Sequence, residues 1–298
     1  MAKLKGKKIK NGIIYCDDSL KLIQTKEFLR KYKGKIDLVF TSPPFPLNSQ
    51  KKYGNKKGNE YIEWLSEYAL ALKPLLSSKG SIVIEIGNSW TPKKPTYSTV
   101  TINALLNFLE KGKYHLCQEF IWNNPAKLPT PAPWVTISRK RVSDTFTKIW
   151  WMSSTAYPRS NNKNVLRPYS EANRKLLKRQ TYNHGERSSG HIISKKGFLK
   201  NNKGSIPSNV IEASNTSSLN PYINYCRKND LKMHPGRMPI EIANFFIKFL
   251  TSNRCRGYIL DPFAGSNTTG AAANKLNRKW ISIERDKSYI KSSLGWFK

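Results

Sequence analysis

Short apolar runs alternate with amphipathic stretches along most of the chain. The runs typical of buried strands lie at 36–40, 81–86, 119–122, 146–152, 258–260 and 280–283. Apolar positions three and four residues apart predict helices at about 60–76, about 98–111 and from about 268. The runs at 119–122 and 146–152 read as one hairpin with a long Pro-rich connection. Strands that alternate with helices are typical of an α/β domain with a parallel sheet.

The stretch from about 155 to 232 breaks this pattern. Between 151 and 230 there are fourteen Lys and Arg against four Asp and Glu, and few apolar positions are periodic. Such a composition suits a disordered linker. Dispersed apolar anchors favour instead a small, irregular, basic subdomain; they are Leu166, Tyr169, Phe198, Ile206, Val210, Ile211 and Tyr222.

A candidate cofactor motif lies near the C-terminus, where YILDPFAGSNTTG is followed by a helix and then by WISIE. A strand with an acidic end, a Gly turn and a helix start can bind a nucleotide, because the helix start offers free N–H groups. Glu284 follows Gly265 by 19 positions, close to the spacing of about 20 at which an acid binds ribose hydroxyls. The full GxGxxG is absent, which favours a smaller nucleoside ligand such as S-adenosylmethionine over a dinucleotide. Taken alone, the motif is also compatible with a plain strand-to-helix turn capped by glycine.

The position of this motif predicts a permuted strand order. Only 33 residues follow Gly265, enough for one more strand but not for a sheet. The N-terminal half must therefore supply the remaining strands.

A second motif, Thr41-Ser42-Pro43-Pro44-Phe45, ends the strand at 36–40. Ligands of α/β sheets bind at the carboxyl ends of strands. Two consecutive prolines remove two backbone donors and stiffen the segment. A fixed carbonyl beside a Ser hydroxyl suits an exocyclic amino group, and Phe45 can stack on the base that carries it. Alone, this motif is more often a Pro-rich turn.

Charge narrows the choice of partner. The 298 residues carry a formal net charge of +33 and a pI of about 10.1, which indicates a polyanion such as nucleic acid or an anionic membrane surface. Lys outnumbers Arg, so genomic base composition is an alternative origin of the charge. The basic residues show no amphipathic helix pattern, which argues against a membrane surface.

Several classes of protein are excluded by what the sequence lacks. No run approaches 18 apolar residues, so we expect no membrane-spanning helix. The basic N-terminus has no apolar stretch of the kind found in signal peptides, so we expect no signal peptide. The four cysteines are far apart and have no partners at metal spacing, so we expect neither disulfides nor a metal site. A reducing cytosol is the expected location.

The two motifs together resemble those of the β-class amino-methyltransferases of DNA, in which the base-amino motif precedes the cofactor motif. This class carries D/S-P-P-Y/F/W and D-P-F-x-G-S-G-T-T-G, and its Ser form is usual for cytosine N4 whereas its Asp form is usual for adenine. Other segments resemble the PvuII-type cytosine-N4 members: TSPPFPLNSQKKYGN, NNPAKLPTPAPWV, SGHIISKKGF, GSIPSNV, HPGRMP and KWISIE. The resemblance spans about 12 to 290. Asn267 stands where the class more often has Gly, and Cys16-Asp17-Asp18-Ser19 where it tends to have Gly-Asp-Ser, so that Asp18 is preferred over Asp17 as the counterpart.

The resemblance implies a Rossmann-like S-adenosylmethionine-dependent methyltransferase fold with permuted motif order. It also implies three regions: a catalytic half at 12–154, a target recognition region at 155–232 and a cofactor-binding half at 233–298. The implied catalytic residues are Ser42, Pro43, Pro44 and Phe45. The implied cofactor-binding residues are Asp18, Thr41, His234, Pro235, Arg237, Asp261, Pro262, Phe263, Ala264, Gly265, Ser266, Asn267, Thr268 and Glu284. The candidates for DNA contact are Lys51, Lys52, Arg174, Arg187, His191, Lys195 and Lys196.

The implied activity is site-specific methylation of cytosine N4 in double-stranded DNA, with S-adenosyl-L-methionine as cofactor and with the target base extruded from the duplex. A cognate restriction endonuclease would share the site without needing to bind this chain. The sequence predicts no membrane partner and assigns no oligomeric state. Adenine-N6 methylation is the nearest alternative, and a non-catalytic DNA-binding protein on the same fold is a further one.

Overall fold

The computed structural model describes residues 4–47, 54–216, 219–254 and 256–298. They form two compact units, and residues 161–208 make up the smaller one. The larger unit consists of the residues up to 160 together with those from 209 onward.

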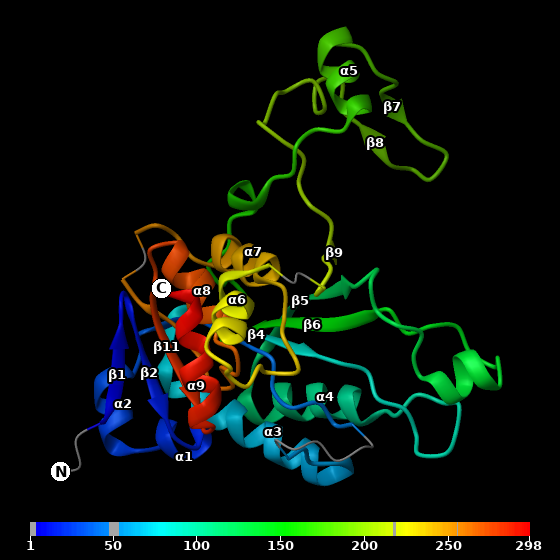
Figure 1. The fold of residues 1–298 in the computed structure, drawn as a ribbon. Coiled ribbons are helices and arrows are strands. Elements are labelled where there is room, and N and C mark those ends of the chain that lie inside the picture. Colours follow the sequence, from blue (N-terminus) through cyan, green and yellow to red (C-terminus); the bar gives the residue numbers. More distant parts are fainter. Residues whose placement is uncertain (1–3, 48–53, 217–218, 255) are drawn as a thin grey trace. The chain divides into compact units, whose positions relative to one another are not determined.

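Nine strands of the larger unit form one sheet in the order β1-β2-β11-β10-β3-β4-β6-β5-β9 (Figure 1). Their bounds are β1 Gly6–Ile9, β2 Gly12–Cys16, β3 Ile36–Thr41, β4 Leu76–Ile86, β5 His115–Asn123, β6 Phe146–Ser153, β9 Val210–Glu212, β10 Tyr258–Asp261 and β11 Lys279–Glu284. The run from β2 to β4 is parallel throughout, whereas β6 pairs antiparallel with both β4 and β5.

The central strands come from opposite ends of the sequence. β10 lies between β11 and β3, and Leu260 pairs with Val39. The permuted strand order is therefore confirmed, and the chain up to Ser153 supplies every remaining strand except the short edge strand β9.

Helices cover both faces of the sheet. The helices of the larger unit are α1 Ser19–Ile23, α2 Lys26–Tyr32, α3 Gly58–Leu72, α4 Val100–Gly112, α6 Pro221–Lys228, α7 Ile240–Leu250, α8 Thr268–Lys275 and α9 Lys287–Ser293. The first four pack on one face and α7 and α8 on the other (Figure 1).

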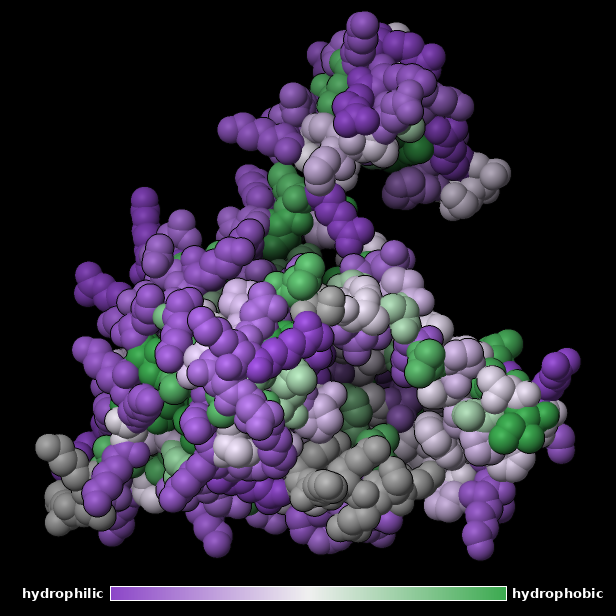
Figure 2. All heavy atoms as spheres, in the orientation of Figure 1, coloured by the Kyte–Doolittle hydropathy of each residue, from purple (hydrophilic) through white to green (hydrophobic). Residues whose placement is uncertain are grey.

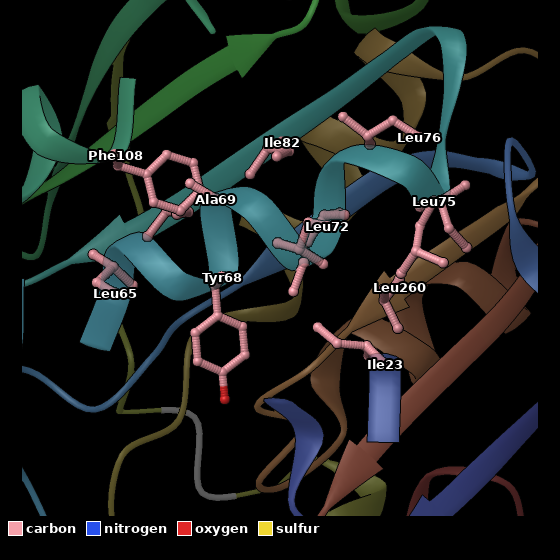
Figure 3. Packing of buried hydrophobic residues seen from close by; sticks show 14 of the residues in the cluster. Ile23, Leu65, Tyr68, Ala69, Leu72, Leu75, Leu76, Ile82, Phe108 and Leu260 are labelled. Carbon is pink, nitrogen blue, oxygen red and sulfur yellow. The ribbon is translucent and has the colours of Figure 1, made fainter. Parts of the chain in front are cut away.

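The alternation of side chains along β3 explains why all six of its residues are buried. Val39 joins the cluster under α1 to α4, whereas Leu38 and Phe40 join the cluster under α7 and α8. In the first cluster, Leu72 of α3 lies with Ile23 of α1 and Leu260 of β10 (Figure 3).

Each predicted element is present, although β5 begins at His115 rather than at 119 and the junction between α3 and β4 differs as well. The expected helix at 60–76 ends at Leu72, followed by a one-turn 3-10 helix at Lys73–Leu75, and β4 begins at Leu76 rather than at 81. Pro74 has no N–H to continue the helical hydrogen bonds, which accounts for the earlier end.

The predicted hairpin is confirmed, since β5 and β6 pair antiparallel. Trp150 and Trp151 of β6 are both buried in the core.

The smaller unit contains α5 Glu171–Arg179 and a two-stranded sheet of β7 Gly185–Glu186 and β8 Ile192–Ile193. α5 buries none of its side chains, and the ring of Tyr182 packs edge-on against Phe198. The stretch expected at 155–232 is thus divided, because β9 joins the main sheet and α6 packs with the larger unit. Within the described ranges no helix is long and apolar enough to cross a membrane.

We expect Phe246→Ala in α7 to lower the free energy of unfolding by about 3–5 kcal/mol, because the ring is fully buried and its removal leaves a cavity. The ring stacks on Phe40 with centroids 5.4 Å apart and meets Phe120 edge-on. Urea unfolding monitored by tryptophan fluorescence measures the loss. Phe249→Ala, at a partly exposed position of the same helix, is the control and should cost clearly less. Equal losses would contradict the packing described.

Candidate active site

The two motifs open into one cavity of about 1000 Å³ at the carboxyl ends of the parallel strands. The sequence-predicted residues that line it are Asp18, Ser42, Pro43, Pro44, Phe45, His234, Arg237, Asp261, Pro262, Phe263, Ala264, Gly265, Ser266, Thr268 and Glu284. Three of the predicted cofactor-binding residues are not part of its wall: Thr41, Pro235 and Asn267. Nearly all of both motifs therefore faces a single space.

Asp261 links the two motifs. Thr41, at the end of β3, donates a hydrogen bond of 2.7 Å from Oγ1 to Asp261 Oδ1, at the end of β10. The same oxygen accepts the backbone N–H of Phe263. Burial raises the pKa of Asp261 to about 6, although the hydrogen bonds from Thr41, Thr269 and Phe263 favour its charged form. Thr41 therefore contributes to the site through its hydrogen bond to Asp261, without lining the cavity itself.

The turn after β10 presents its backbone to the cavity. Gly265 has φ +49°, and a Cβ there would lie 3.0 Å from the His234 ring. Its N–H donates to Glu284 Oε2 at 2.8 Å, while Glu284 Oε1 accepts the N–H of Asp286 at 2.9 Å. The carboxylate of Glu284 is therefore held by two backbone groups at the rim of the cavity.

The buried side chain of Asn267 supports this turn from within the protein. It is fully buried with φ +59° and ψ 38°, a left-handed conformation that Asn tolerates better than most residues. Its Oδ1 accepts a hydrogen bond of 2.6 Å from Ser282 Oγ in β11. Its side chain also lies against Gly270, where a Cβ would be 2.3 Å from Oδ1. The left-handed backbone explains how Asn can stand where glycine is common in the resembling class.

An aromatic wall that the sequence analysis did not identify closes one side of the cavity. Trp64 and Tyr68 of α3 both pack against Phe263, with ring centroids 5.5 Å and 4.9 Å away. Tyr68 OH shares a hydrogen bond of 2.8 Å with Ser19 Oγ. The sequence places Tyr68 only on the apolar face of a helix. The pattern of one helix does not reveal which residues of other elements that face packs against.

The base-amino motif lines the same cavity. Phe45 is half-buried and packs over Gly87, where a Cβ would lie 2.5 Å from its ring. Any larger residue at position 87 would displace Phe45. The glycine that follows β4 therefore sets the position of the aromatic ring.

A buried acid beside Ser42 was also missed. Glu85 lies near the end of β4, lines the cavity and is only 3% exposed. Burial raises its pKa to about 7, whereas a hydrogen bond with Ser42 and the charge of Lys127 lower it. The signal in the sequence was a single acid within the apolar run SIVIEI, since a charge in a buried strand needs a partner or a function.

The segment before α7 brings a cation to the cavity. His234 packs edge-on against Tyr289, and burial lowers its pKa. The guanidinium of Arg237 lies over the Tyr222 ring, and its Nη1 is buried without a hydrogen-bond partner among the described residues. The helix itself begins at Ile240, one residue after Pro239.

The two acidic candidates near the start of the chain both line the cavity. Asp18 is the N-cap of α1 and accepts the backbone N–H of Lys21 at 3.1 Å, and Asp17 accepts the N–H of Asp18 at 2.8 Å. The geometry therefore keeps both as candidates.

The candidates for DNA contact lie elsewhere. The smaller unit carries five of them at exposed or half-exposed positions: Arg174, Arg187, His191, Lys195 and Lys196. Lys51 and Lys52 lie outside the described residues. No group of three or more His, Cys, Asp or Glu in the described part of the chain is arranged to hold a metal ion.

Comparison with known proteins gives one family. A family model described as DNA methylase, of the N6/N4 type, matches residues 36–294. The chain is 37% identical to the type II methyltransferase M.PvuII of Proteus hauseri, over 95% of this chain and 82% of that protein. It is 26% identical to the type II methyltransferase M.ScaI of Streptomyces caespitosus, over 95% and 80% of the two chains.

Solved structures agree with these matches. The structure titled PvuII DNA methyltransferase (cytosine-N4-specific) superposes with a TM-score of 0.75 at 32% identity, covering 97% of this chain and 87% of that one. The M1.HpyAVI complex with S-adenosylmethionine has the same fold, with a TM-score of 0.54 at 20% identity over 94% and 96% of the chains.

We expect Asn267→Ala to lower the free energy of unfolding more than Asn267→Gly, by about 1 kcal/mol, because only glycine adopts φ +59° without cost. Both variants remove the acceptor of Ser282, so their difference isolates the backbone contribution. Chemical denaturation of the two variants in parallel measures it. If the alanine variant proved as stable as the glycine variant, the left-handed backbone at 267 would not be constraining.

Proposed function

Because the chain belongs to the N6/N4 DNA methylase family, we propose that it methylates the exocyclic N4 of cytosine in duplex DNA, as the modification enzyme of a restriction-modification system. The observation that carries the proposal is the placement of Ser42, Pro43 and Phe45 in the same cavity as the turn from Asp261 to Ser266. Its methyl donor is S-adenosylmethionine. The named relatives are bacterial type II methyltransferases, which supports a bacterial cytosol or nucleoid as its place of action.

The choice of cytosine N4 rests on two observations. Position 42 is Ser, the form usual for cytosine N4 in the resembling class, rather than the Asp usual for adenine. The 32% identical structure carries a cytosine-N4-specific title. Adenine N6 is the competing target, and the identity of the methylated nucleoside separates the two.

The cavity offers groups that suit the separate parts of S-adenosylmethionine. Arg237 lines the cavity and its Nη1 has no hydrogen-bond partner among the described residues, which suits a carboxylate. Gly265 adopts the left-handed backbone (φ +49°) that the turn requires and leaves room for the His234 ring. Glu284, fixed by two N–H groups, suits ribose hydroxyls, and Asp17 and Asp18 stand near the other end as acceptors for an adenine amino group. When bound, the cofactor supplies an electrophilic methyl group on a sulfonium, which leaves a neutral thioether after transfer.

The base-amino motif positions the target. We place the extruded cytosine against Phe45, with its amino hydrogens donated to Ser42 Oγ and to the carbonyl of Pro43. These two acceptors favour a pyramidal nitrogen whose lone pair is free to attack. An exocyclic amine attacks directly, so no covalent intermediate with the chain is required.

Glu85 then has a function that the motif alone does not supply. The nitrogen loses one proton as the N–C bond forms, and Ser42 can accept it while passing its own to Glu85, its hydrogen-bond partner. With a pKa raised to about 7, the carboxyl group is a stronger base than an ordinary Glu. Lys127 stands close enough to stabilise the ionised form.

Base reading is assigned to the smaller unit at 161–208, within the 155–232 region expected from the sequence. Its exposed cations suit phosphates, and its short hairpin places Arg187 and His191 at the turn. The roles of the remaining catalytic and cofactor residues are assigned from the motifs of the resembling class; these residues are Pro44, Pro262, Ala264, Thr268, His234 and Pro235.

Nucleoside mass spectrometry of duplex DNA treated with labelled cofactor tests the proposal. We expect N4-methylcytosine, and N6-methyladenine in its place would overturn the choice of base. Ser42→Ala should reduce turnover by about 10²-fold or more, because it removes one acceptor of the amino group and breaks the path to Glu85. Its affinity for S-adenosylmethionine, measured by calorimetry, should stay unchanged. Full turnover by Ser42→Ala would show that the assigned role is wrong.

The pH dependence of methyl transfer tests Glu85 separately. Only the ionised carboxylate accepts a proton, so the single-turnover rate should rise with pH and level off above about 7, the raised pKa. Glu85→Gln cannot titrate and should be slow across this range without the rise. A rise that persists in Glu85→Gln would assign the titration to another group.

A further inference from the structure

The connection between β5 and β6, residues 124–145, is an ordered element that we term the arm. It contains a one-turn π-helix at Pro133–Ile137. The carbonyl of Trp134 accepts the N–H groups of Lys140 and Arg141 at 2.8 and 3.0 Å, and the carbonyl of Thr130 accepts that of Asp144 at 2.9 Å. These bonds fold the arm back on itself rather than leaving it extended.

The root of the arm is fixed by a buried acid. Asp144 accepts a hydrogen bond of 2.6 Å from Tyr97 OH and forms an ion pair of 3.2 Å with Arg141. The guanidinium of Arg141 lies 4.6 Å from the centre of the Tyr97 ring. The side chains of the ion pair are only 12% and 9% exposed, so the pair is held in one geometry.

Beyond this root the arm presents aliphatic side chains to solvent. Leu128, Ile137 and Val142 are 78%, 77% and 86% exposed. Figure 1 shows the short helix of this segment reaching past the sheet, and Figure 2 shows hydrophobic surface on it at the right of the view. Single exposed apolar residues are ordinary, but three within fifteen positions on a braced element indicate a contact surface.

The charge around these side chains suits a polyanion. Arg139 and Lys140 are exposed and lie between Ile137 and Val142 in the sequence. The one acid of the arm, Asp144, already pairs with Arg141. The surface therefore combines exposed cations with apolar groups, as DNA-bending proteins do where aliphatic wedges accompany phosphate contacts.

The arm is continuous with the wall of the cavity that holds the base-amino motif. Lys127 and Thr130 line that cavity together with Ser42 and Phe45. A duplex that delivers one nucleotide into the cavity must bring the flanking nucleotides to its rim, where the arm begins.

We propose that the arm is a second DNA-contacting element, which docks on the duplex beside the extruded nucleotide. Arg139 and Lys140 contact phosphates, while Leu128, Ile137 and Val142 pack against bases and sugars exposed by the extrusion. The inference rests on the proposed function, since it takes duplex DNA as the substrate. Apolar contact with the opened stack would offset part of the unstacking free energy.

Two duplexes test the apolar part. In one, the target cytosine is paired with guanine; in the other, it faces an abasic site, where extrusion already costs little. Ile137→Ser combined with Val142→Ser should slow single-turnover methyl transfer at least about tenfold on the paired duplex, and much less on the abasic one. The matched control is Leu70→Ser with Leu106→Ser, two aliphatic residues on α3 and α4 that are 55% and 58% exposed. The control should behave as the wild type on both duplexes.

The charged part is tested by salt. Arg139→Ala combined with Lys140→Ala should reduce the slope of log affinity against log salt concentration by about 1 for each phosphate that the variant no longer neutralises. Calorimetry with S-adenosylmethionine verifies that each variant keeps the folded cofactor site.

The proposal is overturned if the arm variants bind and methylate the paired duplex like the wild type. It is also overturned if the serine pair loses activity equally on both duplexes. Sedimentation that shows a loss of self-association with no change in DNA affinity would instead identify the arm as an interface between two copies of this chain. The wild type could also bind the duplex more tightly than the arm variants and yet form no methylcytosine. That result would reject the proposed function but would support the proposal that the arm contacts DNA.

Discussion

The parallel pairing of β10 with β3 is the contact on which the site depends. It brings residues more than two hundred positions apart in the sequence into adjacent strands, and the hydrogen bond from Thr41 to Asp261 joins their carboxyl ends. Strands that end side by side present their following loops to a common space. The cofactor turn and the base-amino motif therefore share one cavity because of sheet topology, without any need for sequence proximity.

Two buried carboxyl groups line that cavity and have different neighbours. Asp261 is surrounded by donors from Thr41, Phe263 and Thr269, so it organises the turn and stays in place. Glu85 is hydrogen-bonded to Ser42 of the base-amino motif, and burial raises its pKa to about 7. Burial thus raises the pKa of both acids, and their neighbours distinguish the acid that supports the turn from the one for which we propose proton transfer.

Much of the fold and of the motif sites could be predicted from the sequence because those signals are local. Apolar periodicity locates β3 and β10, and counting the residues after Gly265 predicts the permuted order. Glu85 and Trp64 could not be assigned in this way. Their roles depend on the residues that sheet and helix packing place next to them. The sequence of a single strand or helix does not predict those neighbours.

The permuted sheet also has a consequence for biosynthesis. β3 is apolar along most of its length, but the strand that covers one of its edges is translated only after a further 200 or so residues, roughly ten to forty seconds later at ordinary elongation rates. During that interval the nascent chain carries a hydrophobic strand with open backbone groups, which other chains can pair with. The arrangement that unites the two halves of the site also delays the closure of its sheet until the last strands leave the ribosome.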